Sequence, residues 1–249
     1  STVAAKATRV RARIVAQTIN EQMQASDKVF IMGHANEDYD AIGSAIGMAK
    51  LSLSLNKETY IVLSGRNENV NRISEMLAHE CVKVSDHEED YNSIMVEEEE
   101  ALKHITPSSL LILVDHHREI LTASKSVLDA IPKRIIVDHH RRAEDLLGDT
   151  VLLYLEPSSS STSELLTELV GYFNDRLEIT PAEATALYAG IVLDTKNFAV
   201  QTGERTFEAA ALLRRSGADP TMVRLMFKDD MDVLKLRARL LAEAKTIEP

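Results

Sequence analysis

The chain has 249 residues, of which 39 are acidic and 28 are basic, so its formal net charge at pH 7 is −11. This charge argues against long nucleic acid as a partner, because sequence-independent binding to phosphates needs clustered Lys and Arg. The single cysteine, Cys81, which we interpret as a small buried side chain, excludes an internal disulfide, and no apolar stretch approaches the ~20 residues that span a bilayer. We therefore expect a cytoplasmic chain without direct membrane contact.

The first half of the chain predicts one helix followed by alternating strands and helices. Val10, Ile14, Ile19 and Met23 recur at roughly helical spacing within residues 4–25 and predict an amphipathic helix. Apolar runs that predict strands follow, with helical patterns between them, at residues 28–33, 58–64, 109–115 and 134–138. Alternation of this kind, which continues to about residue 155, is typical of a parallel sheet with crossover helices.

The second half of the chain predicts helices only. Ser and Thr precede an apolar face in residues 158–173, and Pro181 stands just inside the start of the next helical pattern. Two further helices are predicted over residues 205–217 and 221–245. The predicted fold class is therefore α/β, a parallel sheet flanked by helices with a helix-rich C-terminal part.

Potential metal ligands follow three of the predicted strands. The tetrapeptide Val-Asp-His-His occurs twice, each time directly after an apolar run, and His, Asp and Asp follow the first strand in the pattern H-x-x-x-D-x-D. The residues concerned are His34, Asp38 and Asp40, then Asp115, His116 and His117, then Asp138, His139 and His140, with Asp194 closing a later apolar helix. Because ligands of open α/β sheets bind at the carboxyl ends of the strands, we expect these side chains to meet.

Alternating Asp and His suits a centre that holds two metal ions. Carboxylates bridge ions ~3.5–4 Å apart, and imidazoles complete the coordination. Oxygen and nitrogen ligands without thiolates favour two Mn²⁺ ions, or Co²⁺ or Fe²⁺ in their place, over a structural zinc. For any single residue the alternative stays open that the Asp caps a helix or that the His is an exposed loop residue.

Four segments resemble the signature motifs of the DHH phosphoesterase superfamily. They are GHANEDYDAIGSAIG, VDHHR, VDHHRR with EPSSSSTSELLTEL, and ALYAGIVLDTKNF, and the similarity is strongest to the GdpP-type cyclic-di-AMP phosphodiesterases. The resemblance implies an N-terminal linker helix over residues 1–26 and a DHH catalytic domain over 27–220. Residues 221–249 would form a helix leading to a DHH-associated domain, so we expect an excised catalytic domain without that substrate clamp.

The resemblance also implies a role for each motif residue. One Mn²⁺ would be held by His34, Asp38 and Asp115, and the other by Asp40, Asp115, His139 and Asp194, with Asp115 bridging. Among the catalytic candidates, Asp138 would orient a histidine, His140 resembles the substrate-side histidine, and His117 matches a position where this subgroup often has His. We expect His116 to be an exposed neighbour without a role.

Basic and hydroxyl side chains near the motifs are the candidates for holding phosphates. They are Arg118, Arg141, Lys196, Arg205 and Ser160 within the run Ser158–Ser163. For each basic residue a surface role remains open, and plain helix capping is the alternative for the serines.

The activity that the resemblance implies is hydrolysis of cyclic-di-AMP to 5′-pApA by water activated by two metal ions. The alternatives are a DHH-type phosphoesterase acting on pApA or short oligoribonucleotides, a pyrophosphatase, which the downstream segments disfavour, and a catalytically weak nucleotide-binding fragment. Metal-dependent turnover of a phosphodiester would separate the last alternative from the enzymes. A homodimer through the long terminal helices stays open, as does simple packing of those helices on the sheet.

Overall fold

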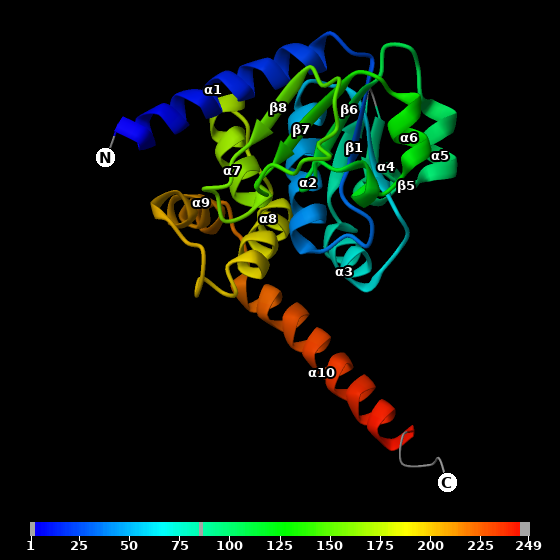
Figure 1. The fold of residues 1–249 in the computed structure, drawn as a ribbon, viewed down its shortest axis with the longest axis vertical. Coiled ribbons are helices and arrows are strands. Elements are labelled where there is room, and N and C mark those ends of the chain that lie inside the picture. The colour runs from blue at the N-terminus through cyan, green and yellow to red at the C-terminus, as the bar shows by residue number, and fades with distance from the viewer. Residues whose placement is uncertain (1–2, 85–86, 245–249) are drawn as a thin grey trace. The chain divides into compact units, whose positions relative to one another are not determined.

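A computed structural model describes residues 3–84 and 87–244 and contains a six-stranded, all-parallel sheet (Figure 1). The strand order is β5-β2-β1-β6-β7-β8. The bounds are β1 Lys28–Met32, β2 Glu58–Leu63, β5 Met95–Glu97, β6 Leu110–Val114, β7 Arg134–Asp138 and β8 Leu152–Leu155. A separate antiparallel pair joins β3 (Cys81–Val84) to β4 (His87–Asp90). The predicted parallel α/β sheet is confirmed.

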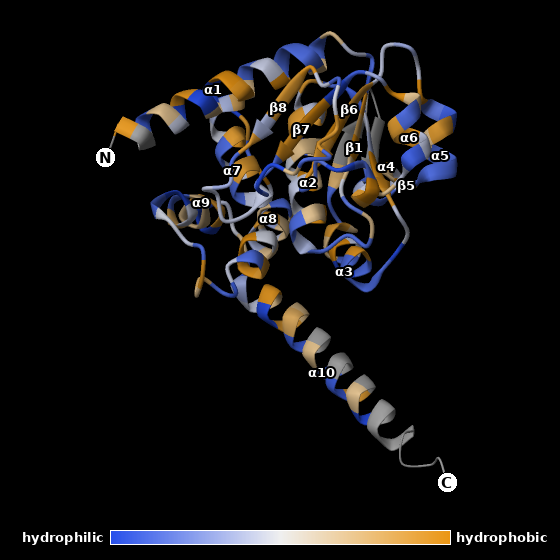
Figure 2. Ribbon diagram, viewed as in Figure 1, coloured by the Kyte–Doolittle hydropathy of each residue, from blue (hydrophilic) through white to orange (hydrophobic). Residues whose placement is uncertain are grey.

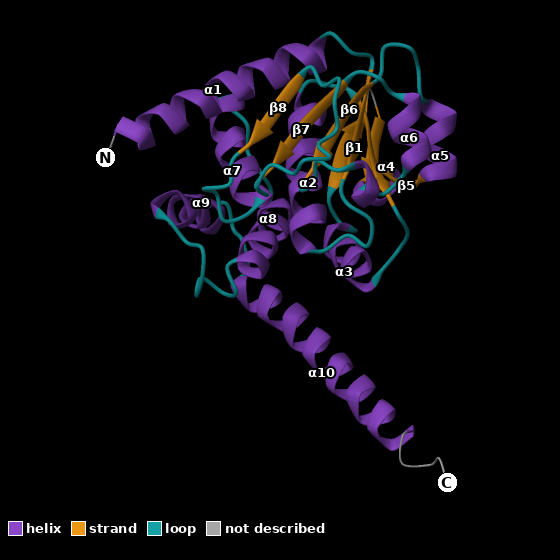
Figure 3. Cartoon of the chain, viewed as in Figure 1, coloured by secondary structure: helices purple, strands orange, loops and turns teal. Residues whose placement is uncertain are grey.

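Helices connect and cover the strands, as the cartoon of Figure 3 shows. Their bounds are α1 Val3–Gln24, α2 Tyr39–Ser54, α3 Glu68–Leu77, α4 Tyr91–Ile94, α5 Glu98–His104, α6 Lys125–Ala130, α7 Thr162–Phe173, α8 Pro181–Asp194, α9 Glu204–Arg215 and α10 Pro220–Ala244. The helix-rich C-terminal part is therefore present from α7 onward.

The strand order reverses direction at β1. From β1 the chain proceeds to β2 and β5 on one side, and it then returns to build β6, β7 and β8 on the other side. The carboxyl ends of β1 and β6 therefore flank the point where the connections diverge, which is the usual place for a ligand site in an open α/β sheet.

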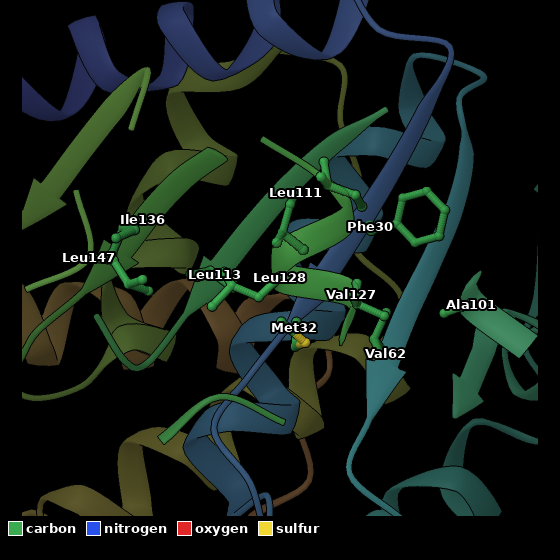
Figure 4. Close-up of a cluster of buried hydrophobic side chains, with 11 residues drawn as sticks. Phe30, Met32, Val62, Ala101, Leu111, Leu113, Val127, Leu128, Ile136 and Leu147 are labelled. Carbon is green, nitrogen blue, oxygen red and sulfur yellow. The ribbon is translucent and has the colours of Figure 1, made fainter. Parts of the chain in front are cut away.

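Apolar side chains cover both faces of the sheet. Figure 2 shows hydrophobic strands in the middle of the fold. On one face Phe30 and Met32 of β1 join Leu111 and Leu113 of β6 under Val127 of α6, all fully buried (Figure 4). Because side chains alternate along a strand, Val29 and Ile31 face the other side, where α2 packs on the sheet and contacts α7 and α8. A sheet buried on both faces gives the site a rigid base.

Helix α1 packs against α7 and β8, and its role as a linker stays a prediction. Its buried positions are Ala12, Val15, Ala16, Ile19 and Met23. Val10 and Ile14, which we placed on the apolar face, are more than half exposed. The small residues Ala12 and Ala16 form the buried stripe instead, because they let the helix approach its neighbours closely.

Two local predictions differ from the structure. The helical pattern between the predicted strands at 109–115 and 134–138, which covers residues 119–131, forms a 3₁₀ turn at Glu119–Leu121 followed by the short helix α6, whose first turn is capped by the Ser124 hydroxyl. Cys81 is exposed at the start of β3, not buried. Both segments lie at the ends of elements, where local sequence patterns are weakest.

The chain divides into two compact units, residues 1–218 and 219–249. The second unit consists of α10, and the last part of the helix predicted to reach 249 lies outside the described residues. Among the helices that the structure describes, none combines the length and apolar character that crossing a membrane requires.

Candidate metal centre

The six predicted metal ligands converge at the carboxyl ends of β1, β6 and β7. His34 lies two residues beyond β1, Asp115 directly follows β6, and His139 directly follows β7. Helix α2 brings Asp38 from its N-cap and Asp40 from its first turn, and α8 brings Asp194 from its last residue. Within the described residues, ligand atoms of His34, Asp38 and Asp115 lie within 4.8 Å of one another, and so do those of Asp40, His139 and Asp194.

The first group is organised around His34. Its Nδ1 lies 2.9 Å from the carbonyl oxygen of Ala35, which leaves Nε2 facing the carboxylates. Nε2 is 3.5 Å from Asp38 Oδ1 and 3.4 Å from Asp115 Oδ2. Asp38 is also the N-cap of α2, since its Oδ1 accepts a hydrogen bond from Ala41 N. The capping alternative and the ligand interpretation therefore apply to the same side chain.

The second group is organised around His139. Its Nε2 lies 3.0 Å from Asp194 Oδ2, 3.5 Å from Asp115 Oδ1 and 3.7 Å from Asp40 Oδ2. Asp115 thus presents one carboxylate oxygen to each group, Oδ2 to His34 and Oδ1 to His139. A carboxylate shared in this way is what a bridging ligand requires.

The N-terminus of α7 holds the carboxylates of the centre in place. The fully buried Asp40 accepts hydrogen bonds from the backbone N–H groups of Thr162 and Ser163, each 2.8 Å long. The Thr162 hydroxyl donates to Asp115 Oδ1 over 3.0 Å. Free N–H groups at a helix start favour anions, but here the anion is a side chain and not a phosphate. Thr162 escaped the sequence analysis, where the serine-rich run was its only signal.

The charges of the centre depend on one another. Burial, together with Asp115 and Asp194, raises the pKa of Asp40 well above its usual value. Burial lowers the pKa of His139, but Asp115 and Asp194 outweigh burial and raise this pKa to about 11. In the same way Asp115 and Asp38 overcome burial and raise the pKa of His34 to about 11. The metal-free centre therefore keeps protons on groups that a cation needs deprotonated.

The donor set fits divalent cations. The Nε2 atom of His139 is buried and forms no hydrogen bond with any residue that the structure describes, although three carboxylates face it. Buried carboxylates gathered around one imidazole nitrogen repel one another unless a positive charge lies between them. Oxygen and imidazole nitrogen ligands suit Mn²⁺ and related ions. The arrangement is therefore that of a metal centre, and the number and identity of the ions belong to the proposal below.

Asp138 joins the two Val-Asp-His-His segments. Its Oδ2 accepts a 2.6 Å hydrogen bond from His117 Nδ1, and its Oδ1 accepts from the Nδ1 and the backbone N–H of His140, at 2.7 and 3.1 Å. His117 is buried, and its Nε2 accepts from Ala143 N, so both of its ring nitrogens are engaged. The His140 side chain is 55% exposed, and Asp138 raises its pKa. His140 thus has a free nitrogen, which His117 lacks.

His116 is buried, so our expectation of an exposed neighbour is wrong. It is 1% exposed, its Nδ1 lies 3.0 Å from the carbonyl oxygen of Val114, and its Nε2 has no hydrogen-bond partner among the described residues. Burial lowers its pKa, which keeps the ring neutral. Two consecutive histidines after a strand do not reveal by pattern alone which of them points inward.

A cavity of about 970 Å³ opens beside the second metal group. His139, His140 and Asp194 contribute to its wall, together with Arg141 and Lys196 from the predicted phosphate-binding set. Ser158 and Ser159 of the predicted serine run also line it, whereas the sequence did not point to the remaining wall, which is formed by Pro157, Val200, Gln201, Thr202 and Gly203. This volume lies near the upper end of the range for small-molecule sites.

Three residues of the predicted phosphate-binding set have other partners. The exposed Arg118 donates to Asp145 through Nε, at 2.7 and 2.9 Å. Ser160 is fully buried and donates to Glu164 Oε2, and Arg205 forms an ion pair with Glu168. None of these three is part of the cavity wall described above. All three were predicted, like Arg141, from their closeness in sequence to a motif. Such closeness does not determine the direction in which a side chain points.

Comparison with known proteins agrees with this geometry. The family model described as the DHH family, N-terminal domain, matches residues 28–191. The chain is 40% identical over 238 residues to the cyclic-di-AMP phosphodiesterase PdeA of Listeria monocytogenes, covering 94% of this chain and 35% of that protein. It is also 40% identical over 236 residues to the cyclic-di-AMP phosphodiesterase GdpP of Bacillus subtilis, covering 95% and 35%. The chain thus spans about a third of the length of these relatives.

The fold recurs in solved structures. The crystal structure of an exopolyphosphatase-related protein from Bacteroides fragilis aligns with a TM-score of 0.67 and 21% identity, over 85% of this chain and 59% of that one. At this identity the likeness shows the fold alone. The family model, by contrast, spans more than half of the chain and includes the strand ends that carry the metal centre. The chain therefore belongs to the DHH family.

Proposed function

We propose that this chain carries the hydrolytic site of a cyclic-di-AMP phosphodiesterase that forms 5′-pApA with two divalent cations, Mn²⁺ or failing that Co²⁺ or Fe²⁺. The observation that carries the proposal is the shared carboxylate of Asp115, which faces His34 with one oxygen and His139 with the other beside a large cavity. The similarity to two cyclic-di-AMP phosphodiesterases supports this substrate.

The proposed ligand sets divide the centre in two. His34, Asp38 and Asp115 would hold one cation, and Asp40, Asp115, His139 and Asp194 the other. When bound, the cations supply Lewis acidity, which neutralises phosphoryl charge and lowers the pKa of water. Thr162 and Ser163 keep Asp40 aimed at this site through their backbone N–H groups.

His140 is the proposed proton donor. Asp138 accepts the hydrogen bond from Nδ1, which fixes the ring and leaves Nε2 for the substrate. As water attacks phosphorus and the bond to the 3′ oxygen breaks, Nε2–H would deliver its proton to that leaving oxygen. The hydrogen bond with Asp138 raises the pKa of His140, which favours the protonated ring that this step requires. His117 would position Asp138 instead of touching substrate, because both of its nitrogens are engaged.

The cavity favours a dinucleotide over pyrophosphate. Its volume of about 970 Å³ exceeds what two phosphates need. Its wall combines the basic side chains of Arg141 and Lys196 with the apolar Val200 and the polar Gln201 and Thr202. We assign Arg141 and Lys196 to phosphate oxygens, where charge-assisted hydrogen bonds are strongest. The remaining wall would then accommodate the nucleosides. A cytoplasmic location and a homodimer stay predictions.

Chromatography of the reaction products tests the proposal. The purified chain is incubated with Mn²⁺ and either cyclic-di-AMP or pApA, with an EDTA control for each. Conversion of cyclic-di-AMP to pApA, abolished by EDTA, is the expected result. Turnover of pApA alone would favour the alternative of a phosphoesterase for linear dinucleotides or short oligoribonucleotides. Two bound metals without turnover of either substrate would contradict the enzymatic proposal and favour a nucleotide-binding fragment.

A further inference from the structure

The bridging position of Asp115 depends on an unusual backbone conformation. Asp115 has φ 62°, in the left-handed region, directly after the last residue of β6. Asp enters this region more readily than most residues, but the left-handed conformation remains uncommon for any residue other than glycine. Because a strand that continued in extended conformation would direct its side chains alternately to the two faces of the sheet, the turn at Asp115 decides where its carboxylate lies.

The structure provides a specific contact across this turn. The Nδ1 of His116 lies 3.0 Å from the carbonyl oxygen of Val114, so one side chain connects the residues on both sides of Asp115. A carbonyl oxygen can only accept, so Nδ1 carries the hydrogen. The ring is 1% exposed, and water therefore does not compete for this hydrogen bond. The backbone N–H of Asp115 itself donates to Val137 O of the neighbouring strand β7.

A role of His116 as a metal ligand does not fit the geometry. Each group of candidate ligands in the described part of the chain includes Asp115, His139 or both, and none includes His116. Its Nδ1 donates to Val114 O, and its Nε2 is buried without a hydrogen-bond partner in residues 3–84 and 87–244. A buried ring with one unsatisfied nitrogen costs stability, so its presence needs an explanation, and the contact of its other nitrogen with Val114 O offers one.

We propose that His116 is a positioning residue that holds Asp115 in its left-handed conformation and so directs one carboxylate oxygen to each cation. This inference rests on the proposed two-metal site. In the first Val-Asp-His-His segment, His116 would then support Asp115 through its contact with Val114 O, whereas His117 donates a hydrogen bond to Asp138.

The test replaces the hydrogen-bond donor and then restores it. His116→Leu removes the donor while filling most of the buried space. His116→Asn keeps an N–H on the atom bonded to Cγ, which is where the Nδ1 of histidine stands. Each purified chain is loaded with Mn²⁺, and the affinity of both sites and the electron paramagnetic resonance spectrum are recorded, since two bridged Mn²⁺ ions give a spin-coupled spectrum that isolated ions do not.

We expect His116→Leu to bind Mn²⁺ about tenfold more weakly, within the range for groups that orient ligands, and to lose the spin-coupled spectrum. His116→Asn should retain both properties. Leu128→Ala, a buried substitution in α6 remote from the ligand set, serves as the control for lost stability and should keep the spin-coupled pair. If His116→Leu does not fold, His116→Met, whose flexible chain adapts to buried space, takes its place.

The outcomes separate this inference from the proposed function. A spin-coupled pair of undiminished affinity in His116→Leu or His116→Met overturns the positioning role, and so does loss of the pair in a folded His116→Asn. Wild-type protein that binds the spin-coupled pair but leaves cyclic-di-AMP intact contradicts the proposed function while His116 can still be tested. Wild-type protein without a spin-coupled pair overturns both.

Discussion

The two Val-Asp-His-His segments are identical in sequence, yet corresponding side chains do different things. In the first, Asp115 faces both metal groups, while His116 and His117 are buried. In the second, Asp138 holds histidines, His139 faces three carboxylates, and His140 is half exposed. The position in the tetrapeptide that faces the candidate metal centre is therefore the Asp in one copy and the first His in the other.

The difference originates in where each strand ends. Strand β6 ends at Val114, and the backbone turns at Asp115. Strand β7 continues through Asp138, which still pairs with Leu155 of β8. One more residue of strand shifts the side chain that points at the site from the Asp to the next His. Pairing with a neighbouring strand, and not the tetrapeptide itself, thus assigns the chemistry.

The largest expected effect comes from removing the shared acid. Asp115→Ala should lower the turnover of cyclic-di-AMP by about 10³-fold or more, beyond the range for groups that only orient ligands. Both metal affinities should fall, because each group loses an oxygen. Metal content after gel filtration and initial rates measure this. Retention of two tightly bound ions would contradict the shared-ligand assignment, and Asp145→Ala, an exposed acid paired with Arg118, is the control.

The second expected effect concerns the first histidine of each copy. Carboxylates raise the pKa of His139 to about 11, whereas burial lowers the pKa of His116. At pH 7 the metal-free protein should therefore have a charged His139 and a neutral His116, which nitrogen NMR of the imidazoles distinguishes. Since each cation must displace a proton from His34 or His139, Mn²⁺ affinity should fall about tenfold per unit as pH decreases from 8 to 6. A pH-independent affinity would mean that these histidines are not ligands.

A smaller effect is expected for the acid of the second copy. Asp138→Asn keeps the shape of the side chain but replaces one acceptor oxygen with a donor, which opposes the N–H of either His117 or His140. We expect turnover to decrease about 10–100-fold with both metals retained. The metal content of purified Asp138→Asn, measured beside that of Asp115→Ala, shows whether the two acids have different roles. If Asp138→Asn lost its metals as Asp115→Ala does, the two acids would have the same role.

The smallest effects should distinguish the arginines that follow the two copies. Arg141 lines the cavity, whereas Arg118 pairs with Asp145 at the surface. Arg141→Ala should raise the KM for cyclic-di-AMP about tenfold, the equivalent of one charge-assisted hydrogen bond. Arg118→Ala should change KM less than about twofold, because exposed ion pairs contribute little. Steady-state kinetics of the two variants decide this, and equal effects would show that the cavity is not the substrate site.

Much of the fold and the convergence of the six candidate ligands could be predicted because their signals are local. Runs such as Leu110–Val114 and Ile135–Val137 predict buried strands from their branched apolar residues alone. The residues that follow them, Asp115 and His139, then fall at one edge of a parallel sheet by topology. The buried stripe of α1 and the late start of α6 were missed, since the first depends on partners in α7 and β8 and the second on one capping serine.

The alternation of strands and helices and the gathering of six candidate metal ligands at the strand ends follow from the amino-acid sequence, because periodicity and chain topology act over short distances. The folded chain, by contrast, was needed to see that His116 lies inside, that Thr162 donates to Asp115 from 47 residues away, and that Arg141 and not Arg118 reaches the cavity. These outcomes depend on hydrogen bonds and packing between segments distant in the chain, and the same tetrapeptide takes whichever role its neighbouring strand leaves to it.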